Sequence, residues 1–158
     1  MRKSLFIIAL ISILFALLAF FVFYYFHSRI SQPRYSKQGN RISLLYVNDQ
    51  KLEVEIVDAS DKRALGLSGR TELCANCGMF FVFPEKSQYS FWMKDMLFDL
   101  DIVWISGDKI VYIAKNVSHE KGASESINPP SEADKVLEIS SGQSDTLGLR
   151  PGDTIIAK

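Results

Sequence analysis

Strands dominate the hydrophobic pattern in the middle of the chain, between residues 78 and 106. Three short runs there are rich in aromatic and β-branched residues, as β-strands are: Met79–Phe83, Tyr89–Met93 and Leu100–Ile105. The short Pro84–Gln88 segment predicts a hairpin loop between the first two strands. The Lys94–Asp99 segment predicts a second loop, and its apolar Met96 and Phe98 indicate that this loop packs against the domain.

Alternating patterns on both sides of this segment predict further short strands. Asn48–Gln50 separates two such runs and indicates a hairpin. Asp58 and Ser60 are helix-capping residue types, which predicts one short helix over Asp61–Leu67. The other expected elements are strands at Ile42–Val47, Leu52–Val57, Lys109–Val117, Val136–Ile139 and Thr154–Ala157, a helical turn at Gln143–Leu147 and a surface loop at Ser118–Asp134. This pattern predicts a mainly β domain, an antiparallel sandwich or barrel with one short helix.

The N-terminal segment differs from the rest because Leu5–Phe26 is almost entirely apolar. As a helix it spans about 33 Å, enough to cross the hydrocarbon core of a bilayer. The run is longer than the apolar part of a signal peptide and has no clear cleavage site, so we expect a single uncleaved transmembrane helix. The expected division is a cytoplasmic tip at residues 1–4, an anchor at 5–26, a linker at 27–40 and a globular domain at 41–158. A single-pass protein of the cell membrane is therefore expected.

The formal net charge of zero hides an uneven distribution of charge. Residues 1–40 hold five basic residues and no acidic one, which leaves 13 Lys and Arg against 18 Asp and Glu in residues 41–158, a net charge of −5. Nucleic-acid binding needs a basic face that displaces counterions, so an acidic domain argues against a nucleic-acid partner. Basic residues flank both ends of the apolar run, and charge alone therefore leaves the membrane orientation undecided.

Several short motifs in the globular part form a recognisable set. They are Arg63-x-x-Gly66-Leu67, Gly78-Met79, Phe81-Val82-Phe83-Pro84, Phe91-Trp92-Met93-Lys94, Leu100-Asp101, Val136-Leu137-Glu138 and Gly152-Asp153. With these motifs the chain resembles the prokaryotic family called domain of unknown function 192. The resemblance implies a small β-rich domain, often behind a signal or anchor segment, with no established activity, and it favours an extracytoplasmic globular domain. The chain departs from the family pattern at Asp95, where Asn is usual, and at Asp99, where Pro is common.

Cys74 and Cys77 are the only cysteines, spaced as Cys-x-x-Cys. Outside the cytoplasm such a pair is expected to oxidise to a disulfide. We favour a structural disulfide in a small loop, because redox-active pairs sit at a helix N-terminus and here a β-strand is expected to follow. A redox role is the alternative. A zinc site is disfavoured, since zinc requires four ligands and His119 offers only a third, so no metal and no cofactor is expected.

The candidate ligand-binding residues are Arg63, Trp92, Lys94, Asp95 and Asp101. Such side chains line pockets in which rings stack on a ligand and charges orient it. Structural roles compete with this interpretation. They are the stronger interpretation for two of these residues: Trp92 is typical of a core residue, and Asp101 is typical of a carboxylate that accepts backbone or Arg hydrogen bonds at a strand start. Arg63 would then pair with a carboxylate, with Asp101 or Glu138 as the natural partner. Asp99 and Asp101 would share one face of a strand and offer an acid–base pair.

The sequence contains no phosphate-binding glycine loop, Ser-His-Asp pattern or metal-binding His pair. It favours a membrane-anchored binding or assembly module of the cell envelope, with an unidentified envelope ligand or protein as partner. The alternatives are a thiol-disulfide oxidoreductase that uses Cys74 and Cys77, and a carboxylate-dependent hydrolase. An open concave site around Trp92 with no perturbed titratable group would indicate the binding module, and disulfide exchange with a test thiol would indicate the oxidoreductase.

Overall fold

The computed structural model describes residues 13–25, 34–122 and 124–157. The chain divides into two compact units, Met1–Pro33 and Arg34–Lys158. In the first unit residues 13–25 are helical, and their large apolar side chains are all more than half exposed. Among the residues described, no helix is long and apolar enough to cross a membrane. The predicted anchor Leu5–Phe26 extends beyond the described helix at both ends, so residues 5–12 and 26 lie outside the described part.

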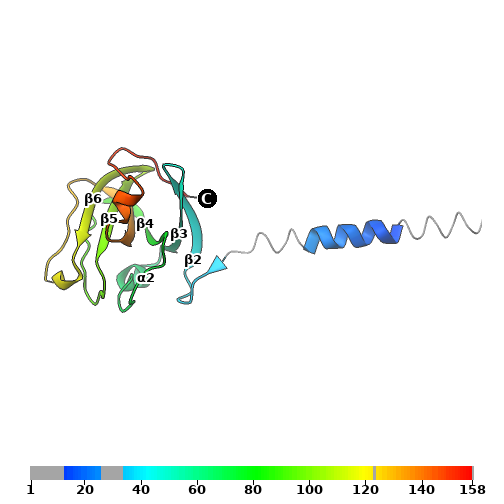
Figure 1. Cartoon of the computed structure of the whole chain (residues 1–158), viewed down its shortest axis with the longest axis horizontal. Helices are drawn as coiled ribbons and strands as arrows, with labels where there is room; N and C mark the ends of the chain where they lie inside the picture. Colours follow the sequence, from blue (N-terminus) through cyan, green and yellow to red (C-terminus); the bar gives the residue numbers. More distant parts are fainter. Residues whose placement is uncertain (1–12, 26–33, 123, 158) are drawn as a thin grey trace, which may run out of the picture. The chain divides into compact units, whose positions relative to one another are not determined.

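The second unit is built on a curled β-sheet that forms a half-barrel (Figure 1). Its strands follow the order β1-β2-β3-β4-β7-β5-β6, and β8 pairs with β2 outside this path. The strands are β1 (Arg34–Tyr35), β2 (Arg41–Val47), β3 (Gln50–Val57), β4 (Cys77–Ser87), β5 (Leu100–Ser106), β6 (Lys109–Val117), β7 (Ala133–Ser140) and β8 (Ile156–Ala157). Every pairing is antiparallel except that of β3 with β4. The predicted mainly β class is confirmed, and a curled sheet takes the place of a closed barrel or sandwich.

The β2–β3 hairpin has the tight turn that the sequence predicts. Val47 pairs directly with Gln50, so only Asn48 and Asp49 occupy the turn. Both have positive φ angles, 48° and 60°, which is the backbone that a two-residue type I′ hairpin requires. Asn and Asp adopt this conformation more readily than other residues that carry a side chain. This local chemistry fixes the register of the two strands.

The prediction for residues 84–93 was wrong. No hairpin loop forms at Pro84–Gln88, because β4 continues to Ser87 after a register shift and pairs with Ala133 of β7. The predicted strand Tyr89–Met93 is reduced to one isolated bridge, between Phe91 and Ile127. Its aromatic residues pack as a cluster instead: the rings of Phe83 and Tyr89 stack with centroids 3.6 Å apart, and Phe91 packs edge-on against Phe81 and Trp104. Aromatic content was therefore a signal of packing here rather than of strand pairing.

The helices are short. Helix α2 (Ser60–Leu65) begins after Ala59, which offers no side-chain cap, and Gly66 ends it with a φ of 52°. Helix α3 (Gln143–Thr146) matches the expected helical turn, and a 3₁₀ turn, η1, covers His119–Lys121.

The compact unit begins earlier than the predicted boundary at residue 41. Arg34 and Tyr35 form β1 and pair with β2, inside the segment expected to be a linker. The guanidinium of Arg34 also donates two hydrogen bonds to the carboxylate of Glu53, at 2.8 and 3.1 Å. The segment lacks hydrophobic periodicity because a two-residue edge strand is too short to show one.

Both faces of the sheet are covered, and each carries its own hydrophobic cluster. The first cluster joins alternate residues of β2, β3, β5 and β7 to Leu147, Leu149 and Ile155 from the C-terminal segment. The second joins the opposite set of strand residues to Leu67, Met93 and Met96. Because α2 and the loops at residues 66–69 and 91–98 belong to this second side, any polar strand residue facing it is enclosed rather than solvated.

Candidate functional site

A polar side chain lies in the middle of the second hydrophobic face. The strand register aligns Glu55 of β3 with Met79 of β4, Met79 with Glu138 of β7, and Glu138 with Ile102 of β5. Residues that pair directly across strands project from the same face of a sheet. Glu138 therefore has apolar neighbours on both adjacent strands.

Among the described residues, Glu138 is the acid that has a buried carboxyl oxygen without a hydrogen-bond partner. Its side chain is only 5% exposed, and its Oε2 atom has no hydrogen-bond partner. Burial raises the pKa of the Glu138 carboxyl to about 8, and the positive charge of Arg70 only partly opposes this rise. An unpaired buried carboxyl destabilises a fold, so its presence requires an explanation other than stability.

Arg70 does not satisfy Glu138 because it is engaged by another acid. Its guanidinium donates to both carboxylate oxygens of Glu55, at 2.6 and 2.9 Å, and Asn40 donates a third bond to the same group at 2.9 Å. Burial acts to raise the pKa of the Glu55 carboxyl, but the hydrogen bonds from Arg70 and Asn40 outweigh it and hold the pKa below its usual value. The partly buried Glu55 and the buried Glu138 thus share one arginine, and only Glu55 is bonded to it.

Glu138 lines a pocket beside helix α2, which we call the α2 pocket. Its lining residues are Arg63, Ala64, Leu65, Gly66, Leu67, Ser68, Phe81, Phe91, Trp92, Lys94, Met96 and Glu138, around a cavity of about 40 Å³. A second hollow of about 210 Å³ shares several of these residues and adds Phe83, Tyr89 and Ser90. Two loops form walls of the α2 pocket, and hydrogen bonds join them. The Ser68 hydroxyl donates to the Lys94 carbonyl at 3.0 Å, and the Gly69 amide donates to the Asp95 carbonyl at 2.8 Å.

Trp92 and Lys94 belong to this pocket, and both side chains are exposed. Trp92 is 55% exposed, so its interpretation as a core residue was wrong. The buried tryptophan is Trp104 on β5, whose indole N–H donates to the Tyr89 carbonyl at 2.9 Å. Trp92 and Lys94 flank the buried Met93, which explains how one short segment supplies both a core anchor and an exposed pocket wall.

Arg63 also lines the pocket but does not pair with a carboxylate, so the predicted partners Asp101 and Glu138 were wrong. Its Nη1 donates to the Asp58 carbonyl and, at 3.0 Å, to the Val82 carbonyl. Its guanidinium carbon lies 5.1 Å from the centre of the Phe83 ring, in cation–π range. These contacts fix the arginine at the junction of α2 and β4.

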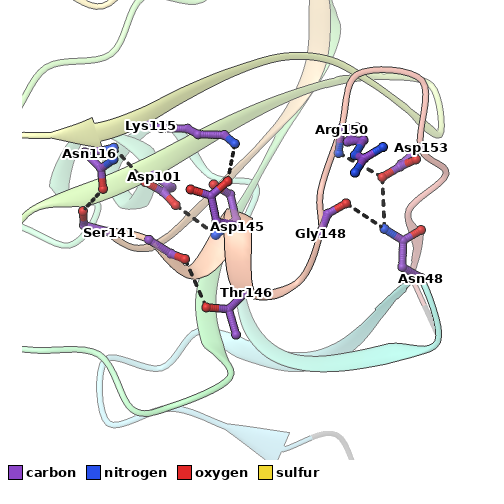
Figure 2. Close-up of polar contacts among 12 residues, drawn as sticks. Asn48, Asp101, Lys115, Asn116, Ser141, Asp145, Thr146, Gly148, Arg150 and Asp153 are labelled. Atoms are coloured by element: carbon purple, nitrogen blue, oxygen red, sulfur yellow. Dashed lines mark hydrogen bonds and ion pairs between the residues drawn. The ribbon is translucent and has the colours of Figure 1, made fainter.

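Asp101 lies in a different part of the domain, where it binds backbone amides (Figure 2). Its carboxylate is fully buried and accepts from the amide of Asn116 on β6 at 2.8 Å and the amide of Ser144 on α3 at 2.9 Å. An ion pair between Lys115 and Asp145 joins the same two elements. The structural interpretation of Asp101 is confirmed, since it holds α3 against the sheet.

Asp95 and Asp99 are not among the residues that line the α2 pocket. Asp95 is exposed and has a φ of 56°, a conformation open to Asp and Asn alike. Asp99 precedes β5, and its Oδ1 accepts from the backbone amide and the Nδ1 of His119, at 2.8 and 2.6 Å. The backbone bond and then the imidazole hold the pKa of the Asp99 carboxyl below its usual value. Asp99 and Asp101 thus have separate partners and do not form an acid–base pair.

Cys74 and Cys77 form a disulfide in the turn that leads into β4. Cys77 is the first residue of that strand, and the amide of Cys77 donates to the Cys74 carbonyl at 3.1 Å. No helix begins at the motif, so the aligned amides that stabilise a thiolate are missing from this turn. Within the described ranges, no group of His, Cys, Asp and Glu side chains is arranged to hold a metal ion.

Sequence reasoning did not identify Glu138 or Arg70 as site residues. Glu138 lies in the short apolar run Val136–Ile139, where a single acid at an alternating position is usually solvent-facing. The only available signal was its neighbours, since a strand this apolar is typical of one buried on both faces.

Comparison with known proteins agrees with this fold. A protein of unknown function from Novosphingobium aromaticivorans shares 27% identity and a TM-score of 0.72, covering 80% of this chain and 93% of that one. A structure described as a putative transcription regulator from Sinorhizobium meliloti shares 25% identity and a TM-score of 0.70, covering 75% of this chain and 95% of that one. Among curated proteins, none matches the chain.

A family profile also matches most of the sequence. The match extends over residues 44–157 and therefore includes β3 to β8, the α2 pocket and the disulfide. The chain belongs to the DUF192 family, described as "Uncharacterized ACR".

Proposed function

We propose that this protein is a membrane-anchored binding module of the cell envelope, and that the α2 pocket is its ligand site. The observation that carries the proposal is Glu138, a buried carboxyl that lacks a hydrogen-bond partner on Oε2 and lines a pocket with exposed Trp92 and Lys94. Proteins keep such groups where a ligand completes them. An apolar pocket with a few convergent polar groups is the usual form of a small-molecule site.

The anchor is proposed from the N-terminal segment. Leu5–Phe26 is apolar over a length that spans a bilayer, and residues 13–25 form a helix whose large apolar side chains are exposed. A helix that is apolar on all sides is stable in lipid rather than in water. Extraction of membranes with carbonate at high pH should leave the full chain in the membrane pellet. Release into the supernatant, or a mature N-terminus beyond residue 20, would refute the anchor.

The ligand site is tested by binding to the full chain in detergent micelles. The probes are a defined set of sugars, amino acids and phosphate esters, each titrated at up to millimolar concentration. Trp92→Ala and Lys94→Ala should weaken saturable binding, because both side chains line the pocket. Leu97→Ala is the matched control, since Leu97 lies in the same loop and is also 55% exposed but is not a lining residue. Equal losses in all three variants, or no saturable binding at all, would refute the assignment.

A nucleic-acid role has less support. One similar structure is described as a putative transcription regulator. Residues 41–158 of this chain carry 13 basic and 18 acidic residues, a net charge of −5. Phosphate backbones require a basic face, so the charge of this domain argues against the same role.

A second candidate function is acid–base catalysis by Glu138. A carboxyl with a pKa of about 8 keeps its proton at neutral pH and can donate it to a bound substrate. p-Nitrophenyl acetate and p-nitrophenyl β-glycosides are suitable probes. Turnover that falls above pH 8 and disappears in Glu138→Gln would support catalysis, and the absence of turnover would exclude it for these ester and glycoside classes.

A further inference from the structure

We propose that the α2 pocket binds a small zwitterion, with a primary ammonium group at Glu138 and a carboxylate or phosphate at Lys94 and Arg63. This inference rests on the ligand-binding function proposed above and specifies the class of ligand. Three features of the pocket support it: the floor, the walls and the rim.

The floor of the pocket offers acceptors without donors. No described side chain donates a hydrogen bond to Glu138, and Oε2 is closed off from solvent. The charge that acts on the Glu138 carboxyl is that of Arg70, from the loop after α2. Arg63 and Lys94 line the same pocket, and Glu55 lies on the same face of the sheet, across Met79 from Glu138. Arg70 is bonded to both oxygens of Glu55, so it leaves Glu138 without a hydrogen bond. A ligand that pairs with the ionised form of Glu138 must therefore bring its own donor, and an ammonium brings three donors and a compensating charge.

The walls favour a cation. Phe81 and Phe91 meet edge to face with ring centroids 5.0 Å apart, and Trp92 and Met96 line the same space. The faces of aromatic rings attract cations, most strongly where water is excluded. In the adjoining second hollow one cation already lies over a ring, since the Arg63 guanidinium carbon is 5.1 Å from the centre of the Phe83 ring. Aromatic walls around an unpaired carboxylate form a site for an ammonium group.

The rim favours an anion. Lys94 is exposed and makes no ion pair with the described part of the chain. Arg63 commits its Nη1 to two carbonyl groups, which leaves Nη2 and Nε as donors for a ligand. These two cations would repel a simple amine, but they complement a molecule whose second group is negative. The two ends of the pocket thus require opposite charges on one ligand.

Binding of such a ligand has a proton signature. Glu138 in the free protein carries a proton near neutral pH, because burial raises its pKa to about 8. In the complex the carboxylate pairs with the ammonium, and the carboxyl proton leaves to solvent. Glu138–COOH and R–NH₃⁺ therefore give Glu138–COO⁻ paired with R–NH₃⁺ and one released proton. A neutral ligand that bonds to the protonated carboxyl releases none.

The test is calorimetry of the full chain in detergent micelles at pH 7, in two buffers with different heats of ionisation. The probes are 4-aminobutyrate and O-phosphoethanolamine, which distinguish a free amino acid from a lipid-type headgroup. 4-Hydroxybutyrate lacks the ammonium and butylamine lacks the anion. We expect one or both zwitterions to bind with release of about one proton, and both controls to bind about tenfold more weakly or not at all.

Two variants test the ammonium end and the anionic end of the ligand separately. Glu138→Gln should fold, lose proton release and weaken binding about tenfold, whereas Lys94→Ala should weaken binding without changing the number of protons released. Binding of 4-hydroxybutyrate as tight as that of 4-aminobutyrate, zwitterion binding without proton release, or no zwitterion binding would overturn the inference. If another compound binds in a Trp92-dependent way without proton release, the pocket function stands and the zwitterion inference fails.

Discussion

Two buried carboxylates on neighbouring strands have opposite surroundings. Asp101 on β5 is directly paired in register with Ile139, and Ile102 with Glu138 on β7. The alternation along β5 and β7 sends Asp101 to the face of the first hydrophobic cluster and Glu138 to the face of the second. Asp101 accepts two backbone amides at 2.8 and 2.9 Å, while Oε2 of Glu138 accepts nothing.

The contrast shows that burial alone does not assign a role to an acid. Asp101 bonds to amides of β6 and α3 that would otherwise be unpaired, and its carboxylate joins two elements. Glu138 joins nothing and faces a pocket with an exposed tryptophan at its wall. The hydrogen-bond inventory therefore separates an acid that joins two elements of the fold from one whose Oε2 has no partner. Changes at each residue should have opposite effects on stability.

The largest expected effect is the loss of Asp101. Asp101→Ala removes two charge-assisted hydrogen bonds and leaves the amides of Asn116 and the buried Ser144 unpaired, which should lower the free energy of unfolding by about 3–5 kcal/mol. Asp101→Asn keeps one acceptor oxygen and should lower the free energy of unfolding by a smaller amount. Urea unfolding followed by circular dichroism measures both. A loss below about 1 kcal/mol in Asp101→Ala would show that the two amide bonds of Asp101 do not stabilise the fold as argued.

Replacing Glu138 should raise the free energy of unfolding, and the size of this gain should depend on pH. Its pKa is raised from 4.5 to about 8 in the folded protein, so the folded state holds a proton that the unfolded state releases between these values. The Glu138 contribution to stability is therefore fully present below pH 4.5 and is lost as pH rises through 8. The loss is on the order of 5 kcal/mol at about 1.4 kcal/mol per pH unit.

Glu138→Gln should remove this dependence and be the more stable protein at pH 9, with the difference measured by urea unfolding across pH 4 to 9. Glu85→Gln, an exposed acid on β4, controls for the loss of one charge. The lowered pKa values of Glu55 and Asp99 act at acid pH instead, since stability from such groups is lost as pH falls through the folded value. Parallel pH profiles for wild type and Glu138→Gln would show that Glu138 is paired after all.

Gly78 holds the strand that carries Glu138 close to β4. A Cβ at position 78 would lie 2.8 Å from the Glu138 carbonyl oxygen, a contact with backbone that cannot rotate away. Gly78→Ala should therefore force β4 and β7 apart and destabilise the domain by about 2–3 kcal/mol. Ser87→Ala, an exposed position on the same strand, should change stability little. Thermal unfolding that is equal for the two variants would contradict this reason for the glycine.

The smallest effect is expected from the disulfide. Replacing Cys74 and Cys77 with Ser opens a very short loop and should destabilise the protein by about 1–2 kcal/mol on the chain-entropy argument. Arg70 should keep its position through its two bonds to Glu55. The pH range over which Glu138 changes the free energy of unfolding should therefore stay the same. Alkylation of the reduced protein across a pH series provides the second measurement. A thiol that reacts well below neutral pH would point to redox chemistry at this turn.

The sequence by itself determined the local elements. The Asn48–Asp49 turn, the strands around it and β5–β6 follow from residue preferences that act over a few positions. The motifs also identified the family, and the capacity of Asp101 for backbone bonds was recognised from its position at a strand start. These properties depend on neighbours along the chain, which a sequence displays directly.

Only the tertiary structure decided what each side chain meets. The continuation of β4 through Pro84 depends on pairing with β7, a partner about fifty residues away. The exposure of Trp92 and the burial of Trp104 depend on which aromatic segment packs under the other. The isolation of Glu138 depends on Leu67, Met93 and Met96, which pack over its face of the sheet, while Arg70 bonds to Glu55. Each outcome is set by contacts between segments far apart in sequence, and local residue preferences do not encode such contacts.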